Sequence, residues 1–220
     1  MTSVYIGAKF DGHDSAVFVV CPAQRQMWGL AMERLTRCKH DPMFPIAALE
    51  RLVAYAPIDA AAVEQVFFAN SFSSDRDTVY PTGQYEFDLA ARRDQDGAGR
   101  LTPDGPLETL HECMTRHLAR IFPGAVVKVR HHDHEYCHAL SSCFTSPFDA
   151  ALLVTMDGVG DHGVFSRAYT LSGGALHAVG LSRSDERIYN PHKGPASFSK
   201  ACSVGGVYSF VTALLGFVVN

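Results

Sequence analysis

Short apolar runs and helically spaced apolar positions alternate along this chain. The runs at residues 4–10, 16–20 and 26–32 are separated by turn-forming residues, which predicts a three-stranded antiparallel meander. Apolar residues at helical spacing then predict a helix over residues 46–54, which Pro57 ends. The first part of the chain is therefore expected to form a sheet covered by a helix.

The second part of the chain shows the same alternation. Residues 65–69 and 125–129 predict strands, with an amphipathic helix over residues 107–121 between them. Asp133 is expected to cap a short helix over residues 134–144. Three more strands are expected at residues 150–156, 164–171 and 175–181, and an apolar helix is expected from residue 203 to 215.

Two turns of the same kind indicate an internal repeat. Asp11 and Gly12 lie between two apolar strands, and so do Asp157 and Gly158. This repetition predicts two similar α/β units, although Asp-Gly is also a common hairpin turn without further meaning. Residues 71–106 show no sustained period and are interpreted as a long loop insertion.

Composition places the chain among ordinary globular proteins. It has 220 residues, of which 47% are hydrophobic and 19% charged. The net charge of −4 and the lack of a Lys/Arg run argue against nucleic-acid binding. No apolar stretch approaches the roughly 20 residues of a membrane span, and the first residues do not resemble a signal peptide. With six scattered cysteines interpreted as reduced thiols, we expect a cytoplasmic protein without a membrane partner.

Histidine is the unusual component of the sequence. Four of the eleven histidines are His131, His132, His134 and His138. His134 and His138 are four residues apart and share one helical face, so both can bind one cation. With Glu135 they also match the H-E-x-x-H pattern of zinc proteases, in which the glutamate is the general base.

The third ligand separates these two interpretations. No ligand for a zinc protease follows at the usual place, whereas Asp157 follows a predicted strand and lies in a glycine-rich turn. Two histidines and one carboxylate with open positions form a site that suits Fe(II). We therefore expect His134, His138 and Asp157 to bind Fe²⁺ or another divalent metal.

Several segments are candidates for binding phosphate. Glycine-rich turns let backbone N–H groups approach an anion, and a serine and glycines at a helix start do the same. Alone, each glycine-rich turn is more often an ordinary turn, and the helix start is at least as typical of a capped core helix. The expected nucleotide- or phosphate-binding residues are Asp11, Gly12, Lys39, Gly158, Gly160, Ser203 and Gly205.

A set of ordered blocks runs through most of the chain. They are residues 11–16, 33–37, 39–41, the pair His134 and His138, residues 146–151, residues 157–160 and positions within 203–217. Together they resemble O-carbamoyltransferases of the NodU/CmcH type, in their N-terminal part. That family resembles the tRNA threonylcarbamoylation proteins of the ASKHA superfamily, which implies an α/β, actin/Hsp70-like, duplicated RNase H-like fold.

The resemblance implies a two-step reaction. Carbamoyl phosphate and ATP give carbamoyladenylate in a separate YrdC-like domain, and the ASKHA-like domain transfers the carbamoyl group to a hydroxyl of a natural-product acceptor, as in antibiotic biosynthesis. It also implies that His134, His138 and Asp157 are metal ligands. His13 is the candidate base for the acceptor hydroxyl, with a simple turn histidine as the alternative. Lys39 is expected to bind the carbamoyl or phosphate group.

The sequence departs from the family at two points. Glu135 stands where the family usually has a second histidine, and the family continues for several hundred residues beyond Asn220. We therefore expect a first subdomain at residues 1–149, the incomplete start of a second at 150–220, no YrdC-like domain, and no full activity from this chain alone. The alternatives are a zinc protease and a non-catalytic nucleotide-binding ASKHA module.

Overall fold

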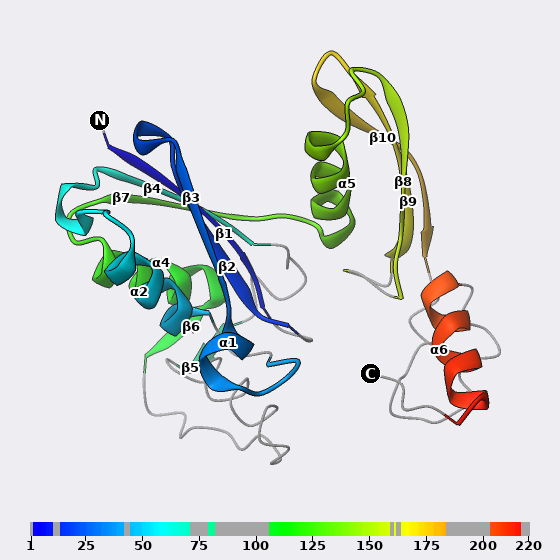
Figure 1. Cartoon of the computed structure of the whole chain (residues 1–220), viewed down its shortest axis with the longest axis horizontal. Helices are drawn as coiled ribbons and strands as arrows, with labels where there is room; N and C mark the ends of the chain where they lie inside the picture. The colour runs from blue at the N-terminus through cyan, green and yellow to red at the C-terminus, as the bar shows by residue number, and fades with distance from the viewer. Residues whose placement is uncertain are drawn as a thin grey trace. The chain divides into compact units, whose positions relative to one another are not determined.

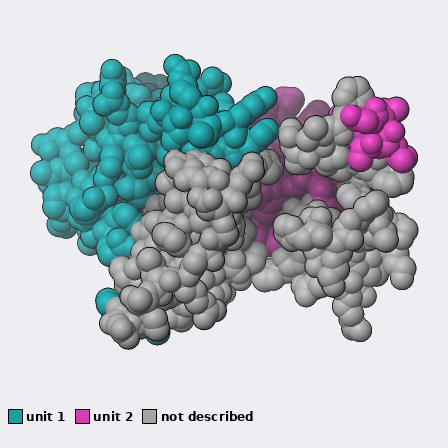
Figure 2. All heavy atoms as spheres, turned by 90° about the horizontal axis from the view of Figure 1, so that it is seen from below, with its two compact units in different colours: residues 1–132 teal, residues 133–220 magenta. Residues whose placement is uncertain are grey.

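The computed structural model describes residues 2–10, 14–41, 45–70, 79–81, 106–158, 161, 164–183 and 203–216 (Figure 1). The chain divides into two compact units, Met1–His132 and Asp133–Asn220 (Figure 2). Each unit combines a β-sheet with helices. The expected α/β class is confirmed.

Unit 1 is built on a five-stranded sheet in the order β3-β2-β1-β4-β7. The strands are β1 (Ser3–Lys9), β2 (Ala16–Cys21), β3 (Gln26–Ala31), β4 (Gln65–Asn70) and β7 (Val126–His131). The first three form the predicted antiparallel meander, and β4 and β7 add to β1 in parallel. This is the RNase H-like arrangement that the resemblance implies.

Two helices, α2 (Ile46–Tyr55) and α4 (Leu110–Ile121), cover one face of this sheet (Figure 1). Side chains alternate between the faces of a strand, so Val4 and Ile6 of β1 are buried beneath these helices, while Tyr5 between them is exposed. Burial of each such aliphatic side chain contributes about 1.5–3 kcal/mol. The predicted helix over residues 46–54 is confirmed.

The start of α4 differs from the sequence expectation. Leu107–Thr109 is a short strand, β6, paired with β5 (Val79–Pro81), and the helix begins at Leu110 rather than at residue 107. Thr109 fixes this start: its hydroxyl accepts the Glu112 N–H at 3.2 Å, and the Glu112 carboxylate accepts the Thr109 N–H at 2.7 Å. Strand β5 lies within the predicted 71–106 loop, of which residues 71–78 and 82–105 lie outside the described residues.

Three short helical elements were not predicted: α1 (Met32–Thr36), η1 (Pro22–Gln24) and η2 (Ala60–Ala62). The first two follow strands directly, and each ends at an arginine in the left-handed backbone region. Elements of three to five residues are too short for the apolar positions in the sequence to show a helical period. Among the described helices, none is long and apolar enough to cross a membrane.

Unit 2 begins with α5 (His134–Thr145), followed by β8 (Ala151–Met156), β9 (Val164–Ser172) and β10 (Ala175–Arg183). The strands form an antiparallel sheet in the order β10-β9-β8, and α6 (Val204–Leu214) follows. This second meander repeats the arrangement of β1 to β3 in unit 1. The repeated meander agrees with the predicted internal repeat, while Asp11 and Gly12 themselves lie outside the described residues.

The division between the units lies earlier than expected. It falls between His132 and Asp133, not between residues 149 and 150, because α5 packs against β8 and β9. The packing side of α5 carries Glu135 and Ala139, both 0% exposed. The helix with the histidine pair thus belongs to the same unit as the turn after β8.

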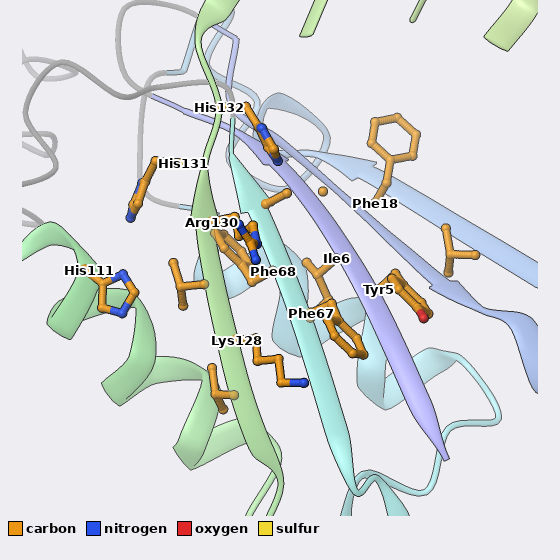
Figure 3. Close-up of a pocket in the computed structure, with 15 residues that line it drawn as sticks. Tyr5, Ile6, Phe18, Phe67, Phe68, His111, Lys128, Arg130, His131 and His132 are labelled. Carbon is orange, nitrogen blue, oxygen red and sulfur yellow. The ribbon is translucent and has the colours of Figure 1, made fainter. Parts of the chain in front are cut away.

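The sheet face of unit 1 opposite α2 and α4 is lined by aromatic and basic side chains (Figure 3). The Tyr5 and Phe67 rings stack at a centroid distance of 4.8 Å, and the Lys128 ammonium lies 4.9 Å from the Phe67 ring centroid. A concavity of about 1180 Å³ lies on this face. None of the predicted site residues is among its lining residues.

Candidate metal centre

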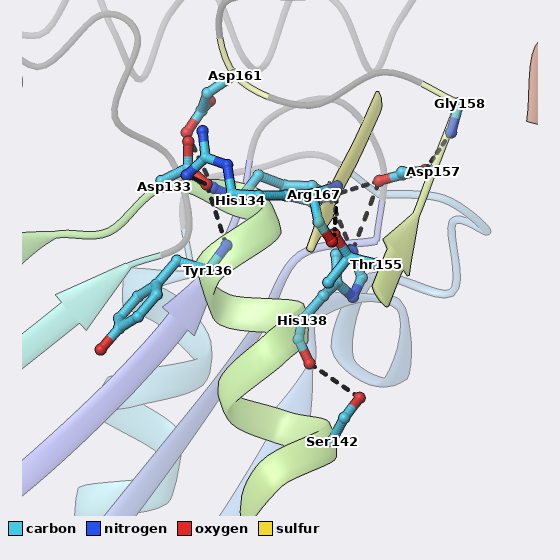
Figure 4. A network of polar contacts seen from close by, with 10 residues as sticks. All are labelled: Asp133, His134, Tyr136, His138, Ser142, Thr155, Asp157, Gly158, Asp161 and Arg167. Atoms are coloured by element: carbon cyan, nitrogen blue, oxygen red, sulfur yellow. Dashed lines mark hydrogen bonds and ion pairs between the residues drawn. The ribbon is translucent and has the colours of Figure 1, made fainter. Parts of the chain in front are cut away.

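The two histidines of the site come from the first turns of α5. The Asp133 carboxylate accepts the Tyr136 N–H at 3.0 Å, which makes Asp133 the N-cap, as predicted. The cap sets the helical start so that His134 and His138 lie one turn apart on one face. Their Nε2 atoms are 3.1 Å apart (Figure 4).

The third side chain comes from the turn after β8. The Asp157 N–H donates to the Phe165 carbonyl at 2.8 Å, which extends the β8–β9 pairing to the start of the turn. One carboxylate oxygen of Asp157 accepts the Gly158 N–H at 2.6 Å. The other, Oδ2, lies 2.8 Å from His134 Nε2 and 3.6 Å from His138 Nε2. Two nitrogens and one oxygen thus converge on a single point.

This arrangement fits a divalent cation. Ligand atoms about 2.1 Å from one ion, at tetrahedral or octahedral angles, lie roughly 3.0–3.4 Å from each other. The observed separations of 2.8, 3.1 and 3.6 Å among the three ligand atoms surround this range. The side chains of His134, His138 and Asp157 are 25%, 54% and 34% exposed, so further coordination positions are accessible to solvent or substrate. The described residues bring together the three predicted ligands.

The charges around the site favour a cation. The hydrogen bond to Asp157 is the largest cause that raises the pKa of His134, and the charges of Asp157, Asp161 and Glu135 add to it while burial opposes it. Hydrogen bonds from His134 and then His138 hold the pKa of Asp157 well below its usual value. Carboxylates that stabilise a proton on an imidazole also stabilise a metal ion that replaces the proton.

A cysteine near the pair does not join the ligand set. Burial is the main cause that raises the pKa of the Cys137 thiol to about 11, and the carboxylates of Asp133 and Asp161 add to it. In the part of the chain that the structure describes, the cluster of potential ligand atoms contains the two imidazoles and the Asp157 carboxylate, without the Cys137 sulfur. The donors are therefore nitrogen and oxygen, as an Fe(II) site prefers.

Glu135 does not occupy the place that a zinc protease requires. Its side chain is 0% exposed, and among the described residues neither carboxylate oxygen has a hydrogen-bond partner. The general base of a zinc protease must contact a metal-bound water, which an enclosed carboxylate does not reach. Burial of the Arg167 guanidinium lowers its pKa, but the hydrogen bond with Tyr169 and the charges of Asp133, Tyr169 and Glu135 raise that pKa above its usual value. The geometry therefore favours the Asp157 interpretation.

Part of the predicted phosphate-binding set lies next to Asp157. A Cβ atom on Gly205 would be 2.6 Å from both Cα and N of Gly158 and 3.0 Å from the Asp157 carbonyl carbon. The buried Ser203 precedes α6, and its carbonyl accepts the Val207 N–H at 3.0 Å. The glycine at 205 thus permits direct backbone contact between the start of α6 and the turn after β8.

Lys39 is exposed in the loop after α1, in unit 1. The candidate base His13 and the predicted phosphate-binding residues Asp11, Gly12 and Gly160 lie outside the described residues.

Sequence reasoning missed Asp161. Its side chain is buried, at 4% exposed, and one carboxylate oxygen accepts the backbone N–H of His134 at 3.1 Å (Figure 4). Asp161 lies in a turn four residues after Asp157, outside any helical or strand periodicity, so the sequence pattern gives no signal for it. Only the folding of the turn onto α5 identifies it.

Comparison with known proteins gives a family over nearly the whole chain. Residues 5–220 match the family described as carbamoyltransferase N-terminus. An uncharacterized protein of Methanocaldococcus jannaschii, MJ1058, is 26% identical over 251 residues, covering 98% of this chain and 40% of that protein. An uncharacterized protein of Synechocystis sp., sll1178, is 27% identical over 197 residues, covering 86% of this chain and 28% of that protein. The chain thus spans less than half the length of either relative.

Solved structures also resemble the chain, at low identity. YeaZ from Pseudomonas aeruginosa has a TM-score of 0.42 and 12% identity, with 88% of this chain and 73% of that chain covered. Lmo2764, a putative N-acetylmannosamine kinase from Listeria monocytogenes, has a TM-score of 0.42 and 14% identity, with 100% and 66% covered.

Proposed function

Because this chain belongs to the carbamoyltransferase family, whose N-terminal region it matches, we propose that it forms the metal-binding part of an O-carbamoyltransferase. The proposed substrates are carbamoyladenylate, made from carbamoyl phosphate and ATP, and a hydroxyl of a natural-product acceptor. The proposed place of action is the cytoplasm. The rest of the catalytic apparatus would come from sequence that the longer relatives contain.

One observation carries the metal part of this proposal. His134 Nε2, His138 Nε2 and Asp157 Oδ2 lie within 4.8 Å of one another, on two elements joined by packing within unit 2. Two imidazoles and one carboxylate are the ligand set of Fe(II) sites with open positions. The proposed cofactor is therefore Fe²⁺, or another divalent metal of similar preference.

In the proposed transfer, the acceptor oxygen attacks the carbonyl carbon of carbamoyladenylate. A new C–O bond forms, the bond from that carbon to the phosphate oxygen breaks, and AMP leaves. His13 is proposed to accept the hydroxyl proton, and Lys39 to bind the carbamoyl or phosphate group. A bound divalent cation supplies Lewis-acid polarisation of the carbonyl.

The start of α6 is proposed to hold the adenylate phosphate together with the turn after β8. Gly158 and Gly205 support this role because their backbones are in direct contact beside Asp157. Backbone N–H groups at a helix start favour an anion. Carried over from the resemblance, Gly12 and Gly160 belong to the same proposed binding set, with Asp11 and Ser203.

A transfer assay tests the proposal. The chain, together with any further sequence that its gene encodes, is incubated with ATP, ¹⁴C-labelled carbamoyl phosphate, Fe²⁺ and a panel of sugar and aminocyclitol alcohols. The proposal predicts AMP release and label in a carbamate ester of an acceptor alcohol. His138→Ala is expected to abolish the label transfer, and His177→Ala, an exposed histidine of β10, is expected to retain it.

The alternative is a non-catalytic nucleotide-binding module. Binding of ATP by the complete protein without label in any carbamate, with metal present, would favour that alternative. Equal label transfer by the wild-type protein and by His138→Ala would contradict the metal role while leaving carbamoyl transfer intact.

A further inference from the structure

The turn after β8 contacts His134 at two separate points. Asp157 Oδ2 lies 2.8 Å from the imidazole Nε2, and Asp161 Oδ2 accepts the backbone N–H at 3.1 Å (Figure 4). The two carboxylates differ in exposure, because the Asp157 side chain is 34% exposed while Asp161 is 4% exposed. One is accessible to a ligand, and the other is enclosed by protein.

We propose that Asp161 is a positioning residue of the metal centre. Its buried carboxylate ties the first residue of α5 to the turn that carries Asp157, which keeps His134 Nε2 and Asp157 Oδ2 at cation-binding separation. This inference rests on the metal site of the proposed function.

The helix start explains why Asp161 matters for His134 in particular. The first N–H groups of a helix have no acceptor within the helix, and a carboxylate there is also favoured by the helix dipole. In α5 these donors are shared between two aspartates: Asp133 accepts the N–H of Tyr136, and Asp161 accepts that of His134. Asp133 precedes the helix directly in sequence. Asp161, by contrast, connects the helix to the Asp157 turn.

The neighbouring charges assign different roles to the two aspartates. The Asp133 carboxylate also accepts from the Arg167 guanidinium at 3.1 Å, so it links α5 to β9. Loss of Asp133 therefore weakens the helix start and its docking on the sheet. Loss of Asp161 frees the first helical residue, which is itself a ligand, from the turn that provides the second ligand.

Metal affinity measured on the 220-residue chain tests this role. Co²⁺ is titrated into metal-free protein and followed by its visible absorption. Asp161→Ala is expected to weaken Co²⁺ binding by roughly 10–100-fold, the usual effect of removing a residue that orients a ligand. Asp161→Asn keeps a side-chain oxygen that accepts the same N–H, so its affinity is expected to stay within about threefold of the wild-type value.

Asp133→Ala is the matched control for the strength of the helix start. It is expected to lower the melting temperature at least as much as Asp161→Ala while weakening Co²⁺ binding less. In the metal-free chain, amide hydrogen exchange at His134 is expected to be faster in Asp161→Ala than in Asp133→Ala, since only the former removes the acceptor of that N–H.

Three results would overturn the inference. The first is a Co²⁺ affinity of Asp161→Ala that equals the wild-type value. The second is a loss of affinity in Asp161→Asn as large as that in Asp161→Ala. The third is a loss of Co²⁺ affinity in Asp161→Ala and Asp133→Ala that is proportional to the decrease in melting temperature of each variant. A wild-type chain that binds neither Co²⁺ nor Fe²⁺ is a different failure, because it contradicts the metal centre of the proposed function as well.

Discussion

The Nε2 atom of His134 lies 2.8 Å from Oδ2 of Asp157, although 23 residues separate the two in the chain. The contact exists because α5 packs against β8 and β9, at whose turn Asp157 lies. Without a metal ion, a proton bridges such a pair. The proton and the cation therefore compete for one place, and this competition leads to several of the tests below.

Removal of one ligand should weaken metal binding strongly. His138→Ala removes an imidazole that is 54% exposed, so the fold should change little while Co²⁺ affinity falls by at least about 100-fold. His177→Ala removes an exposed histidine of β10 and is expected to leave the affinity unchanged. Isothermal titration measures both. Equal affinity in the two variants would contradict the assigned ligand set.

Metal affinity should fall as the pH falls. The hydrogen bond to Asp157 is the largest cause that raises the pKa of His134 above the usual 6.5, so protons begin to compete with the metal above that pH. Co²⁺ titrations at a series of pH values measure this decrease. In the metal-free chain, Asp157→Asn should lower the pKa of His134, read from its imidazole NMR signals. An unchanged pKa would show that the hydrogen bond is absent in solution.

The stability of the metal-free chain should show the opposite trend at alkaline pH. The pKa of His134 is raised in the fold, so its contribution is fully present below pH 6.5 and is lost as the pH rises through the folded value. The pKa of Asp157 is lowered, so its contribution is present above pH 3.8 and is lost as the pH falls. The pair therefore stabilises the fold most between these two values.

Thermal unfolding in the presence of a chelator measures this trend. The difference in melting temperature between the wild-type chain and His134→Ala should be largest near pH 5 and should shrink toward pH 9. A difference that does not change with pH would contradict a charged pair.

The contact between α6 and the turn after β8 should not tolerate a side chain. Gly205→Ala places a Cβ 2.6 Å from backbone atoms of Gly158, which cannot rotate away, so we expect a loss of about 1–3 kcal/mol of stability. The displaced turn also carries Asp157, so Co²⁺ affinity should fall with it. Gly180→Ala is the control, because its Cβ would meet nothing within 4 Å. Wild-type stability in Gly205→Ala would show that α6 does not pack there.

Local signals in the sequence fixed many of the elements correctly. Alternating apolar residues predicted the meander of β1 to β3, and Asp133 was identified as the cap of α5. The start of α4 was placed too early because residues 107–109 fit a helical period, whereas Thr109 and Glu112 form a capping box that begins the helix at Leu110. Pairing with a distant strand, β5, decides the conformation of those three residues.

The sequence by itself determined the side chains of the proposed metal centre and their local spacing: two imidazoles four residues apart on a capped helix, and a carboxylate at the end of a strand. These follow from period, cap and turn, which act over a few residues. The tertiary structure decided how these side chains are arranged relative to one another. The packing of α5 against β8 and β9 sets the 2.8 Å contact of His134 with Asp157, encloses Glu135 away from the site and places Asp161 on the His134 N–H. Such contacts depend on how separate elements dock, and no pattern along a single segment contains that information.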